Sequence, residues 1–400
     1  MTAPRIGFDA VRALRNRTGL GSYARGVLAG LRRAAPALQM HLYTPQPPHP
    51  EFAGLPADLG AELHLPPERW QHTGFRAIWR TFDLGRDAAR DDIDLYHGLT
   101  HEIPRDLPPT GIPSVVTFHD LIYEAHPGWF PIADRWSYRW RYRWSARHAT
   151  AIVAVSARTR RELVERYAVD PARVAVVPPP RNPAFAAPIG TTERAAILAR
   201  HNLPSEYLLS VGTLEARKNH AVLVDAAARL PPDLTIPLVL VGRDGGEAGP
   251  LRLAIQRAHL SDRVRILTTV PAADLPAVMQ GAAVLLYPSR IEGFGMPIVE
   301  ALSAGVPVIA TAGGHLHEAG GSTTCYVAAD DPPAWADAIA RILGDSALAE
   351  TMRRDGLAHA RRFDGDRLAS QLLAVYDAVL TGDPLPETAP APEGIMERTR

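Results

Sequence analysis

Short apolar runs that alternate with longer segments of helical periodicity restrict the fold of this chain more than any other feature. Each run is four to six residues long, and many are rich in Val and Ile. Such runs, without strict polar alternation, are typical of strands covered on both faces. Strands that alternate with helices form parallel β-α-β units, so the sequence predicts an α/β fold. The predicted strands are residues 5–9, 40–43, 93–97, 114–119, 151–155, 174–177, 207–211, 236–241, 263–267, 283–287, 306–310 and 324–327.

The number of strands predicts two domains, because twelve are too many for one ordinary doubly wound sheet. Residues 177–185 contain four prolines in nine positions, which indicates an extended connector. We therefore expect one Rossmann-like domain over 1–186 and a second over 187–365. Residues 366–381 have the pattern of a final amphipathic helix that Gly382 can end. The Pro-rich tail, 382–400, is predicted to be disordered.

Composition excludes several classes of protein. The 43 basic and 43 acidic side chains give no net charge, which argues against a nucleic-acid partner. A single cysteine excludes a disulfide framework and a cysteine zinc site. The sequence has no apolar run of membrane-spanning length, and the start of the chain turns polar too early for a signal peptide. We therefore expect a cytoplasmic protein.

Two glutamates flank a glycine-containing loop that follows a predicted strand. Glu292 lies in the loop and Glu300 lies one turn into the next helix, with Gly293-Phe-Gly-Met-Pro297 between them. The two carboxylates do not share a helical face, but they can contact two parts of one elongated ligand across the helix N-terminus. Carboxylates accept hydrogen bonds from sugar or ribose hydroxyls, and free amides at a helix N-terminus favour an anionic group. The alternative is a pair of solvated glutamates.

Arg217 and Lys218 follow the predicted strand 207–211. A guanidinium and an ammonium group can hold a diphosphate, and Lys218 is the only lysine among the 43 basic side chains. The alternative is a solvent-facing basic loop. We see no Asp-x-Asp metal motif at a strand end, and no metal ligands are predicted.

The amino-terminal half offers further candidates. Gly19 and Gly21 lie in a loop expected between the strand 5–9 and a helix over 23–32, where glycines allow close approach to a phosphate or an acceptor. His119 and Asp120 end the predicted strand 114–119. His119 is placed to contact a substrate or to cap the next turn, and Asp120 either orients the loop or faces the acceptor. For His97, after another strand, a structural role is favoured.

Residues 136–148 carry a tryptophan stripe at i,i+4 spacing beside an arginine stripe. Three interpretations stay open: a core-packing helix with a solvated basic edge, an interfacial surface for anionic lipid or a lipid diphosphate acceptor, and a nucleic-acid surface. The first is favoured. Under the second, Arg139 and Arg143 aid membrane or acceptor contact.

Taken together, these motifs resemble the retaining glycosyltransferases of family 4, which have the GT-B fold. The resemblance rests on Glu292-x7-Glu300, on 211–219 with its Arg-Lys-Asn, on Thr117-Phe-His-Asp120, on Ser156, and on the opening Gly7-Phe-Asp-Ala with Thr18-Gly-Leu-Gly21. Their order matches the family over about residues 5–380. The resemblance implies two Rossmann-like domains that face each other across a cleft, with a final helix that crosses back to the first domain.

The resemblance also implies roles for the candidate residues. Glu292 contacts the hydroxyls of the donor sugar, and Glu300 binds the ribose. The amides of Phe294, Gly295 and Met296 line the sugar and phosphates. The catalytic set is His119, Asp120 and Glu292. The donor-binding set adds Arg217, Lys218, Gly19 and Gly21 to the residues already named. Transfer then proceeds with retention and requires no cofactor or metal, because cations and amides stabilise the leaving diphosphate.

Members of the family with similar motifs use GDP-mannose, which makes mannose the favoured sugar. The expected acceptor is a glycan or a lipid-linked oligosaccharide in surface polysaccharide or lipopolysaccharide assembly, with peripheral contact at the inner membrane face. The alternatives are a non-catalytic scaffold that binds nucleotide sugars and an epimerase or phosphorylase of the same layout.

Overall fold

The computed structural model describes residues 3–70 and 75–387, which form two compact units with one parallel sheet each. One unit comprises the chain up to Pro180 together with the segment that begins at Phe363. The other comprises the intervening residues, Arg181–Arg362. The predicted tail lies outside the described residues from 388 onward. Within the described residues, no helix has the length and apolar character needed to cross a bilayer.

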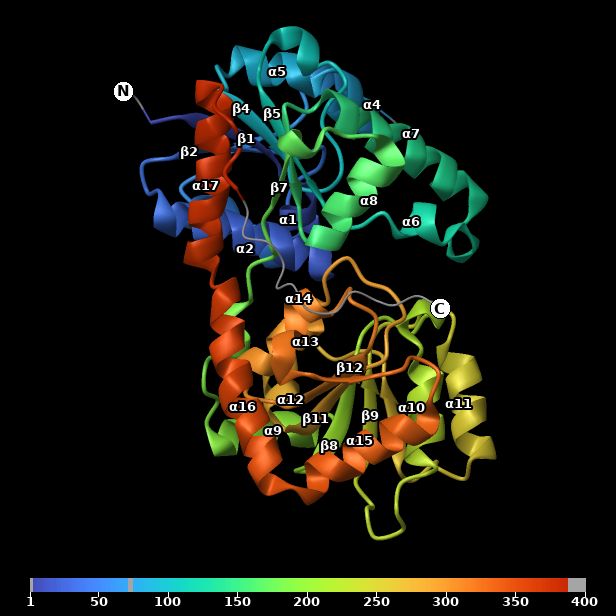
Figure 1. The fold of residues 1–400 in the computed structure, drawn as a ribbon. Coiled ribbons are helices and arrows are strands. Elements are labelled where there is room, and N and C mark those ends of the chain that lie inside the picture. Colours follow the sequence, from blue (N-terminus) through green and yellow to red (C-terminus); the bar gives the residue numbers. More distant parts are fainter. Residues whose placement is uncertain (1–2, 71–74, 388–400) are drawn as a thin grey trace. The chain divides into compact units, whose positions relative to one another are not determined.

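The amino-terminal unit contains a seven-stranded sheet in the order β3-β2-β1-β4-β5-β6-β7 (Figure 1). All of its strand pairs are parallel. The strands are β1 (Arg5–Asp9), β2 (Gln39–Tyr43), β3 (Glu62–His64), β4 (Leu95–Gly98), β5 (Ser114–Phe118), β6 (Ala151–Ala154) and β7 (Val174–Val176). The helices are α1 (Val11–Arg15), α2 (Gly19–Ala34), α3 (Leu55–Asp58), α4 (Arg76–Phe82), α5 (Leu84–Arg90), α6 (Ile122–Ala125), α7 (Ile132–His148), α8 (Ala157–Tyr167) and α17 (Gly365–Thr381).

The carboxyl-terminal unit contains a six-stranded parallel sheet in the order β10-β9-β8-β11-β12-β13. The strands are β8 (Tyr207–Val211), β9 (Leu238–Val241), β10 (Val264–Leu267), β11 (Ala282–Tyr287), β12 (Val308–Thr311) and β13 (Cys325–Val327). The helices are α9 (Thr191–Arg200), α10 (His220–Ala227), α11 (Ala248–Arg257), α12 (Leu275–Gln280), α13 (Met296–Ser303), α14 (His317–Gly320), α15 (Pro332–Gly344) and α16 (Ser346–Ala360).

Helices cover both faces of the second sheet, which explains its unbroken apolar strands. Alternate residues such as Leu208 and Val284 pack with residues of α10, α11 and α15 in one core cluster. Their neighbours Leu209 and Leu285 are equally buried but lie outside that cluster, on the face that α12 and α13 contact. Strands buried on both sides need apolar residues at every position.

Every predicted strand is present to within about two residues, and the structure adds one that the sequence analysis missed. This is β3, which has only three residues, Glu62-Leu-His64, and lies at the edge of its sheet. An edge strand of this length is not covered on both faces, so it shows no apolar run.

The last helix, α17, packs against α2 within the amino-terminal unit (Figure 1). Gly30 on α2 permits close approach, because a Cβ there would lie 2.9 Å from the carbonyl oxygen of Gly365. The Tyr376 hydroxyl lies 2.6 Å from His97 Nδ1, and Arg33 pairs with Asp366 at 2.7 Å. Gly382 ends the helix with a φ of 79°, as predicted. The chain therefore returns to its first unit after completing the second.

Candidate functional site

The strand order of the second sheet brings together the two loops that carry most of the candidate residues. β8 and β11 are neighbours and run parallel, so their carboxyl ends lie side by side. Arg217 and Lys218 follow β8 in a short 3₁₀ turn, and Glu292 lies in the loop after β11. The backbone N–H of Arg290 also donates to the carbonyl of Arg217 at 3.0 Å. Ligand sites in open parallel sheets occur at this end of the strands.

Glu292 is the centre of a buried ionic cluster. Lys218 Nζ donates to Glu292 Oε1 at 2.5 Å, and Arg217 Nη1 lies 2.9 Å from Oε2. Arg217 also donates to the carbonyl of Ile291 at 2.9 Å and to Glu215 at 2.6 Å. Each carboxylate oxygen of Glu292 thus has a cationic partner, and each cation is also held by a second group.

Tyr287 and Ser289 complete the surroundings of Glu292. Ser289 Oγ donates to Glu292 Oε1 at 2.5 Å, and the Tyr287 hydroxyl does so at 3.0 Å. Lys218 Nζ also donates to the Tyr287 hydroxyl at 2.9 Å. The sequence analysis assigned no role to either residue. The available signal was their position, immediately before the motif glutamate at the end of a buried strand.

The cluster fixes the ionisation of Glu292. Burial alone would raise the pKa of this carboxyl, but the positive charges of Lys218 and Arg217 outweigh it and lower the pKa to about 2. For Arg217, burial opposes the charged form, yet Glu292 and Glu215 raise its pKa above the ordinary value. Glu292 is therefore a carboxylate at all physiological pH values.

Glu300 lies in a different electrostatic environment. It is in the second turn of α13 and only partly exposed, and burial raises its pKa to about 7. Gly295 precedes this helix with a φ of 104°, a value that favours glycine. A Cβ at Gly295 would also lie 2.8 Å from Leu316. The loop thus makes a tight, closely packed turn into α13, and the first amides at the N-terminus of this helix are those of Gly295 and Met296.

His119, in the amino-terminal unit, is a buried neutral imidazole. Its Nε2 lies 3.0 Å from the carbonyl oxygen of Leu99, and its ring packs edge-on against Tyr23 at 4.5 Å. Burial, reinforced by the nearby His101, lowers the pKa of His119 to about 3. Because a carbonyl can only accept, Nε2 carries the proton and Nδ1 remains an acceptor.

Residues beside His119 form a hydrogen-bonded network that ties four elements together, namely α2, β4, β5 and α17. Thr117 Oγ1 lies 2.9 Å from His97 Nε2 and 3.1 Å from the Tyr23 hydroxyl. His97 Nδ1 reaches Tyr376 on α17. His97 is fully buried, and its pKa is lowered to about 3 by burial and by His119. These contacts agree with the structural role favoured for His97.

The glycines of the first loop lie in a different element from the one expected. Gly19 and Gly21 belong to the first turn of α2, which follows the short helix α1. A Cβ at Gly21 would overlap the carbonyl of Asn16, whereas nothing lies within 4 Å of one at Gly19. Gly21 thus allows the α1–α2 turn to close. Asp120 accepts a hydrogen bond from the N–H of Ile122 at 3.1 Å, which orients its own loop.

The helix α7 packs against the core, as the favoured interpretation expects, but only one tryptophan of its stripe takes part. Trp144 packs against the core cluster together with Tyr138 and Tyr142, whereas Trp136 is 73% exposed and Trp140 54% exposed. Two of the three tryptophans therefore lie on the exposed face of the helix. A hollow of about 370 Å³ lies over this face. It is lined by Arg105, Trp136, Arg139, Trp140, Arg143, Trp144, Arg147 and His148.

Comparisons with known proteins identify the family of this chain. The family described as "Glycosyl transferases group 1" matches residues 194–358, and "Glycosyltransferase Family 4" matches residues 17–185. The chain is 31% identical to the O-antigen chain mannosyltransferase B of Escherichia coli, over 72% of this chain and 76% of that protein. It is 36% identical to a D-inositol 3-phosphate glycosyltransferase of Salinispora tropica, over 57% of this chain and 51% of that relative.

Solved structures share the fold at low sequence identity. The Anabaena protein HepE in complex with UDP superposes with a TM-score of 0.70 at 18% identity, covering 94% of this chain and 100% of that one. WaaG, a glycosyltransferase involved in lipopolysaccharide biosynthesis, gives a TM-score of 0.68 at 18% identity, with 94% and 100% coverage. Together with the two parallel sheets and the return of α17 to α2, these likenesses confirm the predicted GT-B fold. The chain belongs to the group 1 glycosyltransferases of family 4, a family of retaining enzymes that transfer hexoses from nucleotide sugars.

Proposed function

We propose that this enzyme transfers mannose from GDP-mannose to a glycan or a lipid-linked oligosaccharide, without a metal ion in the reaction. The observation that carries the proposal is the cluster of Arg217, Lys218 and Glu292 at the ends of two adjacent strands. Support for mannose comes from the relative named as an O-antigen chain mannosyltransferase, which matches 72% of this chain.

The cluster supplies the cations that a diphosphate requires. Arg217 and Lys218 carry two positive charges, which the carboxylates of Glu292 and Glu215 balance, and the helix dipole adds partial positive charge at the N-terminus of α13. A donor diphosphate engages both cations as its phosphate oxygens replace carboxylate contacts. Glu292 stays ionised because of its low pKa, and its freed acceptor positions bind hydroxyls of the sugar.

Glu300 is proposed to bind the ribose of the donor. An ionised carboxylate can accept hydrogen bonds from both ribose hydroxyls, whereas burial opposes the charge of the Glu300 carboxylate. The amides of Phe294, Gly295 and Met296 are proposed to contact the sugar and phosphates. Departure of the diphosphate is then stabilised by fixed cations and amides, which need no reorganisation during the reaction.

In the amino-terminal unit, His119 is proposed to accept a hydrogen bond from a hydroxyl of the donor sugar through Nδ1. Its Nε2 contact with Leu99 and its depressed pKa favour this neutral tautomer. Asp120 is proposed to orient the following loop and to face the acceptor, and Gly19 and Gly21 to let the turn approach the donor.

The exposed face of α7 is proposed to bring the enzyme to the cytoplasmic face of a membrane that carries a lipid-linked acceptor. Ile132, Trp136 and Trp140 recur at i,i+4 and are all more than half exposed. Arg105 lies over the Trp140 ring at 3.3 Å, and Arg139 and Arg143 share the single carboxylate of Glu124. Aromatic rings beside an excess of guanidinium groups are typical of contact with anionic lipid.

The decisive experiment incubates the purified chain with GDP-mannose, UDP-glucose or UDP-N-acetylglucosamine and a lipid-linked acceptor, and measures release of the nucleoside diphosphate. We expect acceptor-dependent release with GDP-mannose, and loss of release in Lys218→Met with its fold retained in circular dichroism. Release with a UDP-sugar alone would overturn the choice of donor. Unimpaired release by Lys218→Met would overturn the proposed role of the cluster.

A second acceptor class is favoured by the relatives named D-inositol 3-phosphate glycosyltransferase, which reach 36% identity over about half their own length. The same assay with inositol phosphate in place of the lipid-linked glycan tests this alternative. Turnover with inositol phosphate alone would assign the acceptor to this class.

A further inference from the structure

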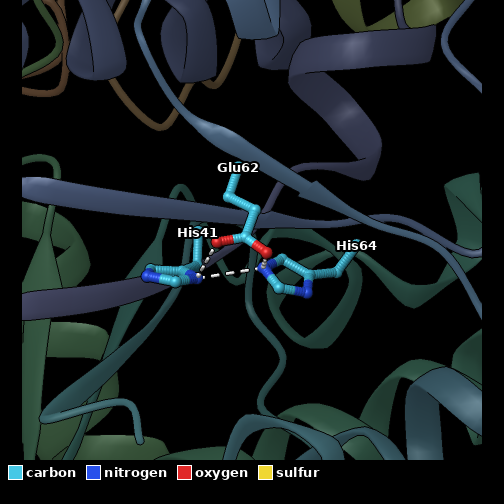
Figure 2. A group of neighbouring side chains, drawn as sticks. All are labelled: His41, Glu62 and His64. Carbon is cyan, nitrogen blue, oxygen red and sulfur yellow. Dashed lines mark hydrogen bonds and ion pairs between the residues drawn. The ribbon is translucent and has the colours of Figure 1, made fainter. Parts of the chain in front are cut away.

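The edge strand β3 of the amino-terminal sheet and its neighbour β2 place two histidines and a glutamate on one face. In the parallel pairing of β2 with β3, His41 lies opposite Glu62, and Tyr43 lies opposite His64. Side chains two residues apart on a strand point to the same face. All four side chains therefore share one side of the sheet, and Figure 2 shows the two imidazoles and the carboxylate directed toward one point.

We propose that His41, Glu62 and His64 form a binding site for a divalent transition-metal ion of the zinc type. His41 Nδ1 lies 2.9 Å from His64 Nε2, and Glu62 oxygens lie 3.7 Å from His41 Nδ1 and 3.8 Å from His64 Nε2. Donors of a tetrahedral zinc site lie about 3.3 Å from one another, because each is about 2 Å from the metal. The three spacings bracket that value, so small side-chain movements suffice to close the site.

Asp91 and Tyr43 orient His64 for this role. Asp91 Oδ2 lies 3.2 Å from His64 Nδ1 and accepts from the Tyr43 hydroxyl at 2.7 Å. Tyr43 also stacks on the His64 ring, with centroids 4.6 Å apart. The Asp91 carboxylate favours the tautomer of His64 with the proton on Nδ1, in which the lone pair of Nε2 faces His41 and Glu62. Metal-binding histidines are commonly held by a carboxylate in this way.

Charge and accessibility agree with a cation at this point. Two carboxylates, Glu62 and Asp91, act on His41 together with one guanidinium, that of Arg5. Glu62 is 65% exposed while the His41 side chain is almost completely buried, so an ion can enter from the Glu62 side. Two imidazoles and one carboxylate suit zinc or a neighbouring transition metal rather than Mg²⁺ or Ca²⁺.

The bound ion would join β3 to β2. β3 has only three residues and pairs with β2 alone, because it lies at the sheet edge. A metal that binds only the folded chain stabilises it by mass action. The site is thus assigned a structural role, separate from the sugar-transfer reaction, for which no metal is proposed.

The test is a calorimetric titration of the chelator-treated full chain with ZnCl₂, together with the visible absorption of bound Co²⁺. We expect one ion per chain and a Co²⁺ spectrum typical of four-coordinate nitrogen and oxygen ligation. His64→Gln and Glu62→Gln should each weaken zinc binding by at least about tenfold, the lower end of the effect of outer-shell changes. Because Glu62 is exposed, its substitution leaves the fold intact even if substitution at His64 does not.

His201 provides the matched control. It lies 2.8 Å from the carboxylate of Asp274 but belongs to no such three-donor group among the described residues. His201→Gln should therefore leave zinc affinity and stoichiometry unchanged. Absence of saturable binding in the unmodified chain would overturn the proposal. Binding of the same affinity in Glu62→Gln and in a folded His64→Gln would overturn it equally.

Discussion

Replacement of Glu300 by glutamine should increase the stability of the folded protein at neutral pH. Burial raises the pKa of this carboxyl from 4.5 to about 7. The unfolded chain loses the proton near pH 4.5, whereas the folded chain retains it to about pH 7. The folded state therefore binds more protons between these values, and stability falls as the pH rises through this window. The shift corresponds to about 2–3 kcal/mol when the partial exposure of the side chain is taken into account.

Urea denaturation at pH 4.5, 6 and 7.5 measures this effect. Relative to the unmodified chain, Glu300→Gln should be nearly neutral at pH 4.5 and more stable by about 2 kcal/mol at pH 7.5. Glu350→Gln is the matched control, because Glu350 is a surface residue of α16 whose side chain is 73% exposed. It should show no such pH-dependent gain.

As the pH rises, the affinity for the donor should increase, whereas the folding stability of the unmodified chain decreases. If the ionised form of Glu300 accepts from the ribose, donor affinity in the unmodified chain increases as the pH rises through about 7. Glu300→Gln should bind the donor more weakly at pH 8 and lose this pH dependence. A variant that is less stable than the unmodified chain at pH 7.5, or one that keeps the original pH dependence of binding, would refute the reasoning.

Glu292→Gln should destabilise the chain at neutral pH by about 3 kcal/mol in urea denaturation, because two buried cations lose their counter-charge. In the unmodified chain, the stabilisation from Glu292 should be lost as the pH falls from 4.5 toward 2; an unchanged acid limb in the variant would argue against it. Gly21→Ala should cost about 2 kcal/mol through overlap with the neighbouring turn, while Gly19→Ala, with open space around its Cβ, should be neutral; equal effects would contradict the packing argument. Trp136→Ala combined with Trp140→Ala should reduce sedimentation with anionic vesicles at least fivefold, and full retention of binding would exclude α7 as the contact surface.

The sequence predicted the elements of this fold better than the neighbours of its functional residues. Buried parallel strands are readable because apolar residues predominate on both faces, and all twelve such runs are strands. The sequence analysis did not predict β3, because Glu62-Leu-His64 is short and two of its three residues are polar. The same segment supplies two of the three proposed metal ligands, and its signal was the alternation that places Glu62 and His64 on one face.

The sequence analysis predicted that Glu292, Arg217 and Lys218 contact the same donor molecule, but not that they form ion pairs with one another. Their direct contact follows from the adjacency of β8 and β11, which strand order decides and local sequence does not. The choice of which aromatic residues of α7 are buried did not follow from its pattern for a related reason. Tryptophan and tyrosine both recur along this helix, so periodicity alone could not decide which aromatic face is buried.

The return of α17 to α2 has a consequence for how the protein is made. The first unit lacks a helix that is synthesised only after all of the second unit. Until then, the contacts that α2 makes with α17 are missing, and the nitrogen of His97 that faces Tyr376 lacks its native partner. The first unit therefore cannot complete its fold until α17 has been synthesised, and a nascent chain arrested near residue 362 would expose apolar surface that chaperones bind.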